Sequence, residues 1–192
     1  MNERDEYIEQ VTIGEQPENA EILLAEYNPA WPALYEREAE KLQKALGNKA
    51  LQIHHVGSTS VPGLCAKPVI DILLLVKDAV DEADYLPEMT QSGYVLRIRE
   101  PDWFEHRMFK GPDTDINLHV FSEDCEETAR MLAFRDRLRA SEEDRSLYAS
   151  VKRELSKRSW QHVQHYADAK SEVVAEIIAR AIEAISTDGG RV

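Results

Sequence analysis

The chain has 192 residues, and its 23 Lys and Arg against 36 Asp and Glu give a formal net charge of −13. A chain of this length builds one sizeable core rather than two independent domains, and so acidic a chain gains little from counterion release, which argues against an extended nucleic acid as partner. A hydrophobic fraction of 43% excludes general disorder. The longest apolar run, at residues 69–76, is interrupted by Asp71 and is too short to cross a bilayer. We therefore expect no membrane contact and, because no signal segment opens the chain, a cytoplasmic location.

Residues 1–20 are polar and show neither a strand nor a helix period, which predicts an arm or a short edge strand. Behind it we expect one domain, residues 21–185, and a frayed tail at 186–192. Residues 21–27 (EILLAEY) predict a strand that ends at Asn28-Pro29, since Asn-Pro favours a turn. Pro32 suits the first position of a helix, and apolar residues at helical spacing predict that this helix runs up to Gly47.

The remaining elements follow from apolar runs and from helical periodicity. We expect strands at residues 51–56, 69–76, 94–99, 107–110 and 115–122. We expect helices at residues 79–93, 126–140, 141–157 and 166–185, with Ser141 and Asp144 at capping-box spacing. This order of strands followed by a helical block predicts an α/β (α+β) fold with helices packed against the sheet.

Residues 57–68 form a loop rich in glycine, proline and hydroxyl side chains between two predicted strands. At its start, Gly57-Ser58-Thr59 lets backbone N–H groups and hydroxyls converge, because Gly57 has no Cβ to block close approach. Such a turn can hold a phosphate group. The alternative is a tight turn from strand to loop that binds no ligand.

Asp71 is an acidic residue in an otherwise apolar strand. A buried carboxylate is costly unless it is paired, hydrogen-bonded or bound to a metal ion. Lys67, which precedes the strand, is a candidate partner for Asp71 or for a ligand phosphate. Asp71 and Lys67 are therefore the candidate catalytic residues, and the alternative is a carboxylate with a purely structural role.

The run HVGSTSVPGLCAKPVIDI, residues 55–72, resembles the signature of the GrpB family. The resemblance extends over residues 20–185 or so, and it includes YNPAWP at 27–32, NLHV at 117–120 and FRDRLR at 134–139, together with Gly93, Tyr94, Tyr148, Lys152 and Leu155. Members of this family resemble the nucleotidyltransferase fold. The resemblance therefore implies a mixed β-sheet flanked by helices, with a C-terminal helical block.

The resemblance also implies roles for particular residues. Gly57, Ser58 and Thr59 stand where the family fold has a phosphate-binding turn, and Asp71 stands near the metal carboxylates of active transferases. A divalent metal ion, Mg, Mn or Zn, is the implied cofactor. Similar domains occur fused behind dephospho-CoA kinase, where they look like accessory or folding parts.

The carboxylates of this candidate metal site are incomplete. Active nucleotidyltransferases carry two carboxylates one residue apart on this strand, whereas neither position two residues away from Asp71 is acidic. Alternation puts Asp115, Asn117 and His119 on one face of a later strand, which can complete the site if the two strands are neighbours. The candidate metal ligands are then His55, Asp71, Asp115 and His119, and such a set suits Zn²⁺ or Mn²⁺ better than Mg²⁺.

Four basic residues fit the family pattern and can gather into one positive spot on an acidic body, namely Lys67, Arg135, Arg139 and Lys152. Such a spot suits a small anionic ligand or a nucleotide. Because acidic residues lie close to the arginines in the sequence, ordinary surface ion pairs are the alternative.

Two functions are consistent with these patterns. In the first, the protein is nucleotidyltransferase-like: it binds a nucleotide or another small phosphorylated ligand with a divalent metal ion and transfers a nucleotidyl group. In the second, it is a non-catalytic accessory or folding module that retains the transferase fold. The incomplete carboxylate pair is the reason for considering the second.

Overall fold

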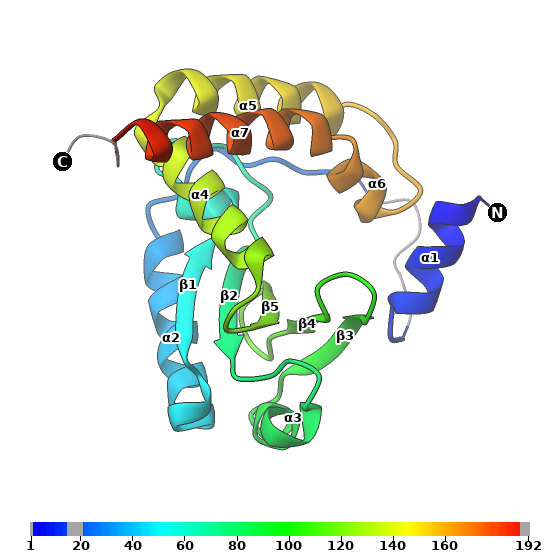
Figure 1. Ribbon diagram of the computed structural model, residues 1–192. Helices are drawn as coiled ribbons and strands as arrows, with labels where there is room; N and C mark the ends of the chain where they lie inside the picture. The colour runs from blue at the N-terminus through cyan, green and yellow to red at the C-terminus, as the bar shows by residue number, and fades with distance from the viewer. Residues whose placement is uncertain (1, 15–20, 189–192) are drawn as a thin grey trace.

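A computed structural model describes residues 2–14 and 21–188 and centres on one five-stranded mixed sheet (Figure 1). The strand order is β1-β2-β5-β4-β3, and only the central β2–β5 pair is parallel. The strands are β1 (Gln52–Val56), β2 (Ile70–Val76), β3 (Val95–Glu100), β4 (His106–Lys110) and β5 (Ile116–Ser122). Each lies within two residues of its predicted bounds.

Helices cover both faces of the sheet (Figure 1). The α-helices are α1 (Glu3–Val11), α2 (Trp31–Leu46), α3 (Glu82–Gln91), α4 (Glu126–Ala140), α5 (Glu142–Ser156), α6 (Val163–Asp168) and α7 (Ser171–Asp188). The Ser141 side chain caps α5 by accepting from the backbone N–H of Asp144 at 3.2 Å, as the spacing predicted. The predicted fold class, a mixed sheet flanked by helices with a C-terminal helical block, is confirmed.

The register of the sheet decides which side chains face which helices. On β2, Ile70, Ile72 and Leu74 belong to the main core, which α2 and α3 cover, whereas Leu73 and Leu75 pack with residues of α4. Because side chains alternate along a strand, Asp71 shares the α4 face with Leu73 and Leu75. Asp71, the second residue of β2, therefore points toward the space between the sheet and the helical block.

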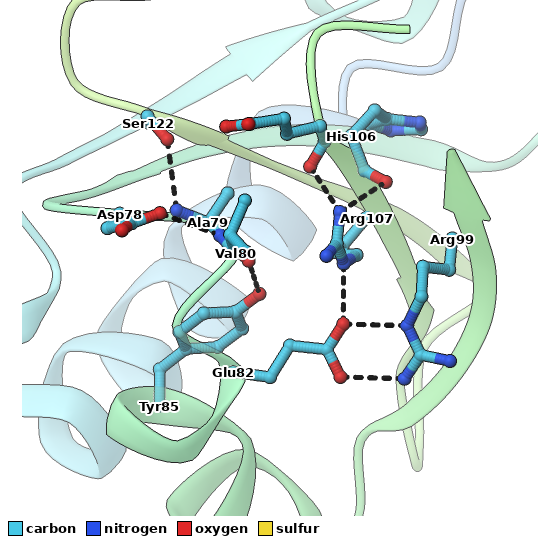
Figure 2. A network of polar contacts seen from close by, with 10 residues as sticks. Asp78, Ala79, Val80, Glu82, Tyr85, Arg99, His106, Arg107 and Ser122 are labelled. Carbon is cyan, nitrogen blue, oxygen red and sulfur yellow. Dashed lines mark hydrogen bonds and ion pairs between the residues drawn. The ribbon is translucent and has the colours of Figure 1, made fainter. Parts of the chain in front are cut away.

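A charged network on the opposite face ties α3 to the β3–β4 hairpin (Figure 2). The Glu82 carboxylate accepts from Arg99 Nε at 2.7 Å and Nη2 at 2.6 Å, and it accepts from Arg107 Nε at 2.6 Å. The Arg107 side chain is only 5% exposed. Glu82, Arg99 and Arg107 are called here the α3 cluster, and both arginines are paired with the one carboxylate. The hydrogen bonds from Arg99 hold the pKa of the Glu82 carboxyl below its usual range.

The N-terminal segment differs from the sequence-based expectation. Where an arm or edge strand was predicted, residues 3–11 form α1. At the start of this helix, Asn2 Oδ1 accepts from the Asp5 N–H at 2.9 Å, and the Asp5 side chain accepts from the Asn2 N–H. This is the capping-box pattern with Asp in the third position. Arg4 then pairs with Asp168 at 2.7 Å, so α1 lies beside α6 (Figure 1). Residues 1 and 15–20 of the predicted arm lie outside the described residues.

Residues 21–27 do not form the predicted strand. Among their apolar residues, Ile22 is buried and packs with Leu155 and Tyr166 of the helical block. The backbone makes only an isolated bridge, Ala25 with Ala66, through hydrogen bonds of 2.8 and 2.9 Å. The neighbour of this segment is therefore the loop after β1 rather than a sheet edge.

The last predicted helix is two helices. α6 ends at Asp168, whose carbonyl oxygen accepts from the Ser171 hydroxyl at 2.6 Å, and α7 begins at Ser171. A serine hydroxyl that competes for a helix carbonyl favours such a break. α7 continues to Asp188, past the predicted start of the tail at 186, and the remainder of that tail, residues 189–192, lies outside the described residues. None of the helices in the described ranges is long and apolar enough to span a membrane.

Candidate functional site

Asp71 lies against the glycine that begins the loop after β1. Gly57 has φ +67°, and a Cβ built on it would lie 2.8 Å from Asp71 Cβ and 2.9 Å from Asp71 Cγ. A side chain at position 57 would thus displace the carboxylate, besides being strained by the positive φ. The glycine predicted to allow close approach does so, and the group that approaches it is the side chain of Asp71.

Two residues of β5 contact the Asp71 carboxylate. The parallel register pairs Asp71 with Asn117, and Asn117 Nδ2 donates to Asp71 Oδ1 at 2.9 Å. His119 Nε2 lies 3.7 Å from the same oxygen. Burial opposes ionisation of Asp71, but the contacts with His119 and Asn117 outweigh it and hold the pKa of Asp71 below its ordinary value. Asp71 is therefore a carboxylate at neutral pH.

Two lysines act on this carboxylate without binding it directly. Lys67 and Lys170 are partly buried, and neither forms an ion pair within 4.0 Å with any residue in the described part of the chain. Lys170 Nζ lies over the Tyr166 ring, 4.4 Å from its centroid. Burial lowers the pKa of Lys170 to about 8 and also lowers the pKa of Lys67, in both cases partly offset by Asp71. Asp71, Asn117, His119, Lys67 and Lys170 are called here the Asp71 cluster.

A chain of hydrogen bonds leads away from His119 toward α1. His119 Nδ1 lies 3.0 Å from His106 Nε2, and His106 Nδ1 lies 2.7 Å from Glu100 Oε2. Tyr7 of α1 donates to the other Glu100 oxygen at 2.9 Å. Burial lowers the pKa of His106 to about 4, so this ring is neutral at pH 7.

This chain fixes how His119 faces Asp71. The Glu100 carboxylate can only accept, so His106 donates from Nδ1, and its Nε2 then accepts from His119 Nδ1. His119 therefore donates from Nδ1 to His106, and its Nε2 is the ring nitrogen that faces Asp71 Oδ1, at 3.7 Å.

A cavity of about 750 Å³ opens beside the Asp71 cluster, between the sheet, α1 and the helical block. Lys67, Asn117 and His119 line it together with Lys110 of β4. Trp103, in the loop between β3 and β4, also lines it. This space, called here the main cavity, has the size of an ordinary small-molecule site.

The predicted metal ligands do not gather into one group. His55 lies on the opposite face of the sheet, because the antiparallel register pairs it with Ile72 rather than with Asp71. There its Nε2 lies 3.0 Å from Thr59 Oγ1, its ring stacks on Tyr35, and burial lowers its pKa to about 4. His55 and Asp71 therefore face different sides of β1 and β2.

Asp115 does not complete the set either. Its carboxylate is exposed and accepts from Lys110 Nζ at 2.9 Å. The residue that stands beside Asp71 on β5 is the amide Asn117, so the second carboxylate of a two-metal site has no counterpart there. In the described ranges no three His, Cys, Asp or Glu side chains lie close enough to hold a metal ion. The donor set beside Asp71 does not fit the metal pair of a nucleotidyltransferase.

The other predicted phosphate ligands support the loop after β1. Lys152 is buried and donates to Ser58 Oγ at 2.9 Å and to the carbonyl oxygen of Cys65. Arg135 donates to the His55 carbonyl oxygen at 3.2 Å, and Arg139 donates to the Ser60 carbonyl oxygen from two nitrogens. Burial lowers the pKa of Lys152 to about 7. A phosphate-binding role for these groups stays a prediction, since their present contacts hold the loop.

Three residues of the site were missed from the sequence. Glu100 and His106 lie at facing ends of the β3–β4 hairpin, and Lys170 lies between α6 and α7. The pairing Glu100↔His106 follows from a hairpin register with an irregularity at Leu96/Ile98, which no local pattern shows. Alternation did place Asn117 and His119 on one face, and that part of the prediction is confirmed by their shared contact with Asp71.

Fold and site together define an α/β protein with a cavity beside one ionised carboxylate. The GrpB family (GrpB protein) matches residues 21–180, so the chain belongs to this family. A UPF0157 protein of Halalkalibacterium halodurans is 64% identical over 178 residues, which cover 92% of this chain and 91% of that protein.

Two further similarities concern the fold and a larger relative. The crystal structure of GrpB from Enterococcus faecalis is similar with a TM-score of 0.71 and 30% identity, covering 85% of this chain and 99% of that chain. A dephospho-CoA kinase of Mycolicibacterium paratuberculosis is 27% identical over 177 residues, which are 79% of this chain but only 44% of the kinase. The predicted membership of the family and its relation to a domain of some dephospho-CoA kinases are confirmed.

Proposed function

We propose that this protein binds a small phosphorylated ligand, such as a nucleotide, in the main cavity, with the phosphate groups near Lys67 and Lys170. One observation carries the proposal: Lys67, which lines the main cavity, and Lys170, which is partly buried and acts on the same Asp71 carboxylate, have no ion-pair partner among residues 2–14 and 21–188. Buried cations are ordinarily paired. A phosphate group supplies the missing negative charge.

The local charge balance favours an anion over a cation. Asp71 contributes one negative charge and Lys67 and Lys170 contribute two positive charges, whereas Lys110 at the cavity wall is already paired with Asp115 at 2.9 Å. The net charge of −13 repels anions at long range, so such a site has to be local and enclosed. Enclosure strengthens each contact because water screens it less.

The proposal does not include nucleotidyl transfer by a pair of metal ions. The two positions where the second carboxylate of such a pair would lie are the apolar Val69 and Leu73, and the residue beside Asp71 on β5 is the amide Asn117. His119 and Asn117, which both contact Asp71, instead form a polar part of the cavity wall. A cytoplasmic location, where such ligands are abundant, stays a prediction.

The experiment is calorimetric titration of the metal-stripped protein with tripolyphosphate and with the four ribonucleoside triphosphates, each without and with Mg²⁺ or Mn²⁺. We expect binding without metal. Lys67→Met keeps the apolar stem and removes the charge, and we expect it to weaken binding about tenfold, as loss of one charged contact does.

Lys77→Met is the matched control, because Lys77 is exposed at the far end of β2 and does not line the main cavity. It should leave the affinity unchanged. If none of these phosphates binds to the wild-type protein under any of these conditions, the proposed function is wrong.

The second candidate function is a non-catalytic accessory module. The amide of Asn117 in place of a carboxylate favours it, as does the match to 44% of a dephospho-CoA kinase. An inert module has no small ligand, so its melting temperature should not rise with any phosphate, whereas a ligand at 100 times its Kd stabilises a protein by about 2.7 kcal/mol. A thermal shift with tripolyphosphate therefore separates the two functions.

A further inference from the structure

The main cavity differs chemically from one end to the other. Lys67, Lys110 and Asn117 line one end, and Trp103, His106 and Phe121 line the other. His106 and Lys110 are the first and last residues of β4, so the two ends lie about 13 Å apart along the strand at the usual rise per residue. The cavity thus has a cationic end and an aromatic end.

The loop that carries the aromatic end has an unfavourable backbone. Phe104 and Glu105 both have positive φ, +50° and +55°, and they are the only non-glycine residues with positive φ within the described ranges. Side chains with a Cβ rarely adopt this conformation. Strain of this kind persists where the surrounding structure imposes it, and it frequently occurs at ligand sites.

The loop is held in place by the site itself. The Trp103 N–H donates to the Glu100 carbonyl oxygen at 3.3 Å, and the Trp103 carbonyl oxygen accepts from the His106 N–H at 3.1 Å. The Trp103 ring packs edge-on against His106 at 5.3 Å and against Phe121 at 5.9 Å between ring centroids. His106 in turn belongs to the hydrogen-bond chain that ends at Asp71.

Trp103 nevertheless keeps 39% of its surface exposed, although it lines a cavity and has aromatic neighbours. The indole plane lies at 66° to 89° to the rings of Phe104, His106 and Phe121, so none of these three rings is stacked parallel to it. An indole face at a cavity wall is the surface on which planar rings stack.

We propose that Trp103 determines specificity in the main cavity by stacking on a planar aromatic ring of the phosphorylated ligand, such as a nucleobase, while the phosphates reach the cationic end. This inference rests on the proposed function, and it adds that the ligand carries a planar ring as well as phosphate groups. It assigns the β3–β4 loop as the part of the protein that distinguishes a phosphate carrying a ring from one without it.

The test compares ATP with tripolyphosphate, which has the phosphates and lacks the ring, by calorimetric titration without metal. In the wild-type protein we expect ATP to bind at least tenfold more tightly than tripolyphosphate. Trp103→Ala should weaken ATP binding about tenfold, the scale of one base–aromatic stack, and should leave tripolyphosphate binding within twofold. Trp103→Phe should restore most of the ATP affinity.

Val95→Ala is the control, because Val95 is an exposed apolar residue of β3 that does not line the main cavity. It should change neither affinity. If Trp103→Ala does not fold, Trp103→Leu, which keeps apolar volume without an aromatic face, takes its place.

Four outcomes would overturn the inference. Equal affinity of the wild-type protein for ATP and tripolyphosphate, or equal ATP affinity of the wild type and Trp103→Ala, would refute the role of Trp103 and leave phosphate binding intact. A loss of both ligands in folded Trp103→Ala and Trp103→Leu would show that Trp103 supports the whole cavity and does not select the ring. No binding of either ligand by the wild type would refute the proposed function as well.

Discussion

The two faces of the sheet each carry a cluster of one carboxylate and two strong cations, and the clusters differ in how these groups meet. In the α3 cluster, Glu82 binds both of its arginines with N···O distances of 2.6 to 2.7 Å (Figure 2). In the Asp71 cluster, the carboxylate binds the amide of Asn117, and its two lysines form no ion pair within 4.0 Å in the described part of the chain. Each cluster therefore has one carboxylate and two cations, but the two cations are paired with the carboxylate only in the α3 cluster.

The chemistry of the two cations explains part of this difference. A guanidinium is planar and offers a fixed fork of donors, so two arginines can share one carboxylate with good geometry. An ammonium is a compact, strongly hydrated charge whose pKa shifts readily on burial, as the pKa of Lys170 does. We expect from this comparison that the arginine cluster contributes to the stability of the fold, and the proposed function requires the lysine cluster to be available to a ligand.

The largest expected effect on the free energy of unfolding comes from breaking the α3 cluster. Glu82→Gln leaves the nearly buried Arg107 guanidinium without its counter-charge, and we expect the free energy of unfolding to fall by about 3 kcal/mol. Urea denaturation measures it. Arg99→Ala removes the more exposed arginine and should cost less than about 1 kcal/mol. Equal and small losses in both variants would contradict the structural role of this cluster.

The next effect concerns the contact between Gly57 and Asp71. Gly57→Ala combines a positive φ with a Cβ that collides with the Asp71 side chain, and we expect it to cost about 2 to 3 kcal/mol in unfolding free energy. Gly63→Ala is the control, since Gly63 also has positive φ but has no neighbouring atom within 4 Å of the place that a Cβ would take. It should cost only about 1 kcal/mol. Similar losses at both positions in chemical denaturation would mean that Asp71 moves aside easily.

Alkaline pH should change both the stability of the protein and its affinity for tripolyphosphate, because it deprotonates Lys170 of the Asp71 cluster. Lys170 has a pKa of about 8 in the folded protein because of burial, and an ordinary lysine in the unfolded chain titrates near 10.4. Between these values the unfolded state binds more protons, so this group makes stability rise with pH there. Tripolyphosphate affinity should fall about tenfold from pH 7 to pH 9.5 as the ammonium is lost.

Calorimetric titrations over this range, with Lys170→Met as the reference, isolate the contribution of Lys170. The variant should bind tripolyphosphate more weakly at pH 7 and should show a flatter pH dependence. If the wild type and the variant have parallel pH profiles, Lys170 is not part of the anion site.

The smallest expected effect is the change in unfolding free energy when Lys67 of the Asp71 cluster is replaced. Because Lys67 has no ion pair to lose among the described residues, Lys67→Met should change the unfolding free energy by less than about 1 kcal/mol, in the stabilising direction if at all. Chemical denaturation without ligand is the measurement. A loss above about 2 kcal/mol would show that Lys67 is a structural partner of Asp71, and the distinction between the two clusters would then fail.

The sequence was informative where chemistry and periodicity act locally. The continuous apolar run of β2 and the alternation of β5 placed both strands, and Asp71 stood out as an acidic residue in the first of them. The prediction that Asn117 and His119 share a face with each other followed from alternation alone. These are properties of single strands and need no knowledge of the partner.

What could not be predicted depends on pairing. His55 and Val56 are adjacent, and which of them shares a face with Asp71 is decided by one residue of register between β1 and β2. Lys170 reaches the cluster from a helix junction far along the chain, and α1 docks through Tyr7 and Arg4 on residues 93 and 164 positions away in the sequence. For the same reason, the sequence could not show that His55 faces away from Asp71.

The loop after β1 has an unusual mechanical dependence. Arg139 of α4 binds the Ser60 carbonyl oxygen, and Lys152 of α5 binds Ser58 Oγ and the Cys65 carbonyl oxygen, so two helices of the helical block hold this loop. Within the loop, the N–H groups of Ser60 and Val61 donate to the carbonyl oxygens of Gly57 and Ser58. Amide hydrogen exchange at Ser60 and Val61 should consequently report undocking of these helices rather than the rapid exchange of a surface loop.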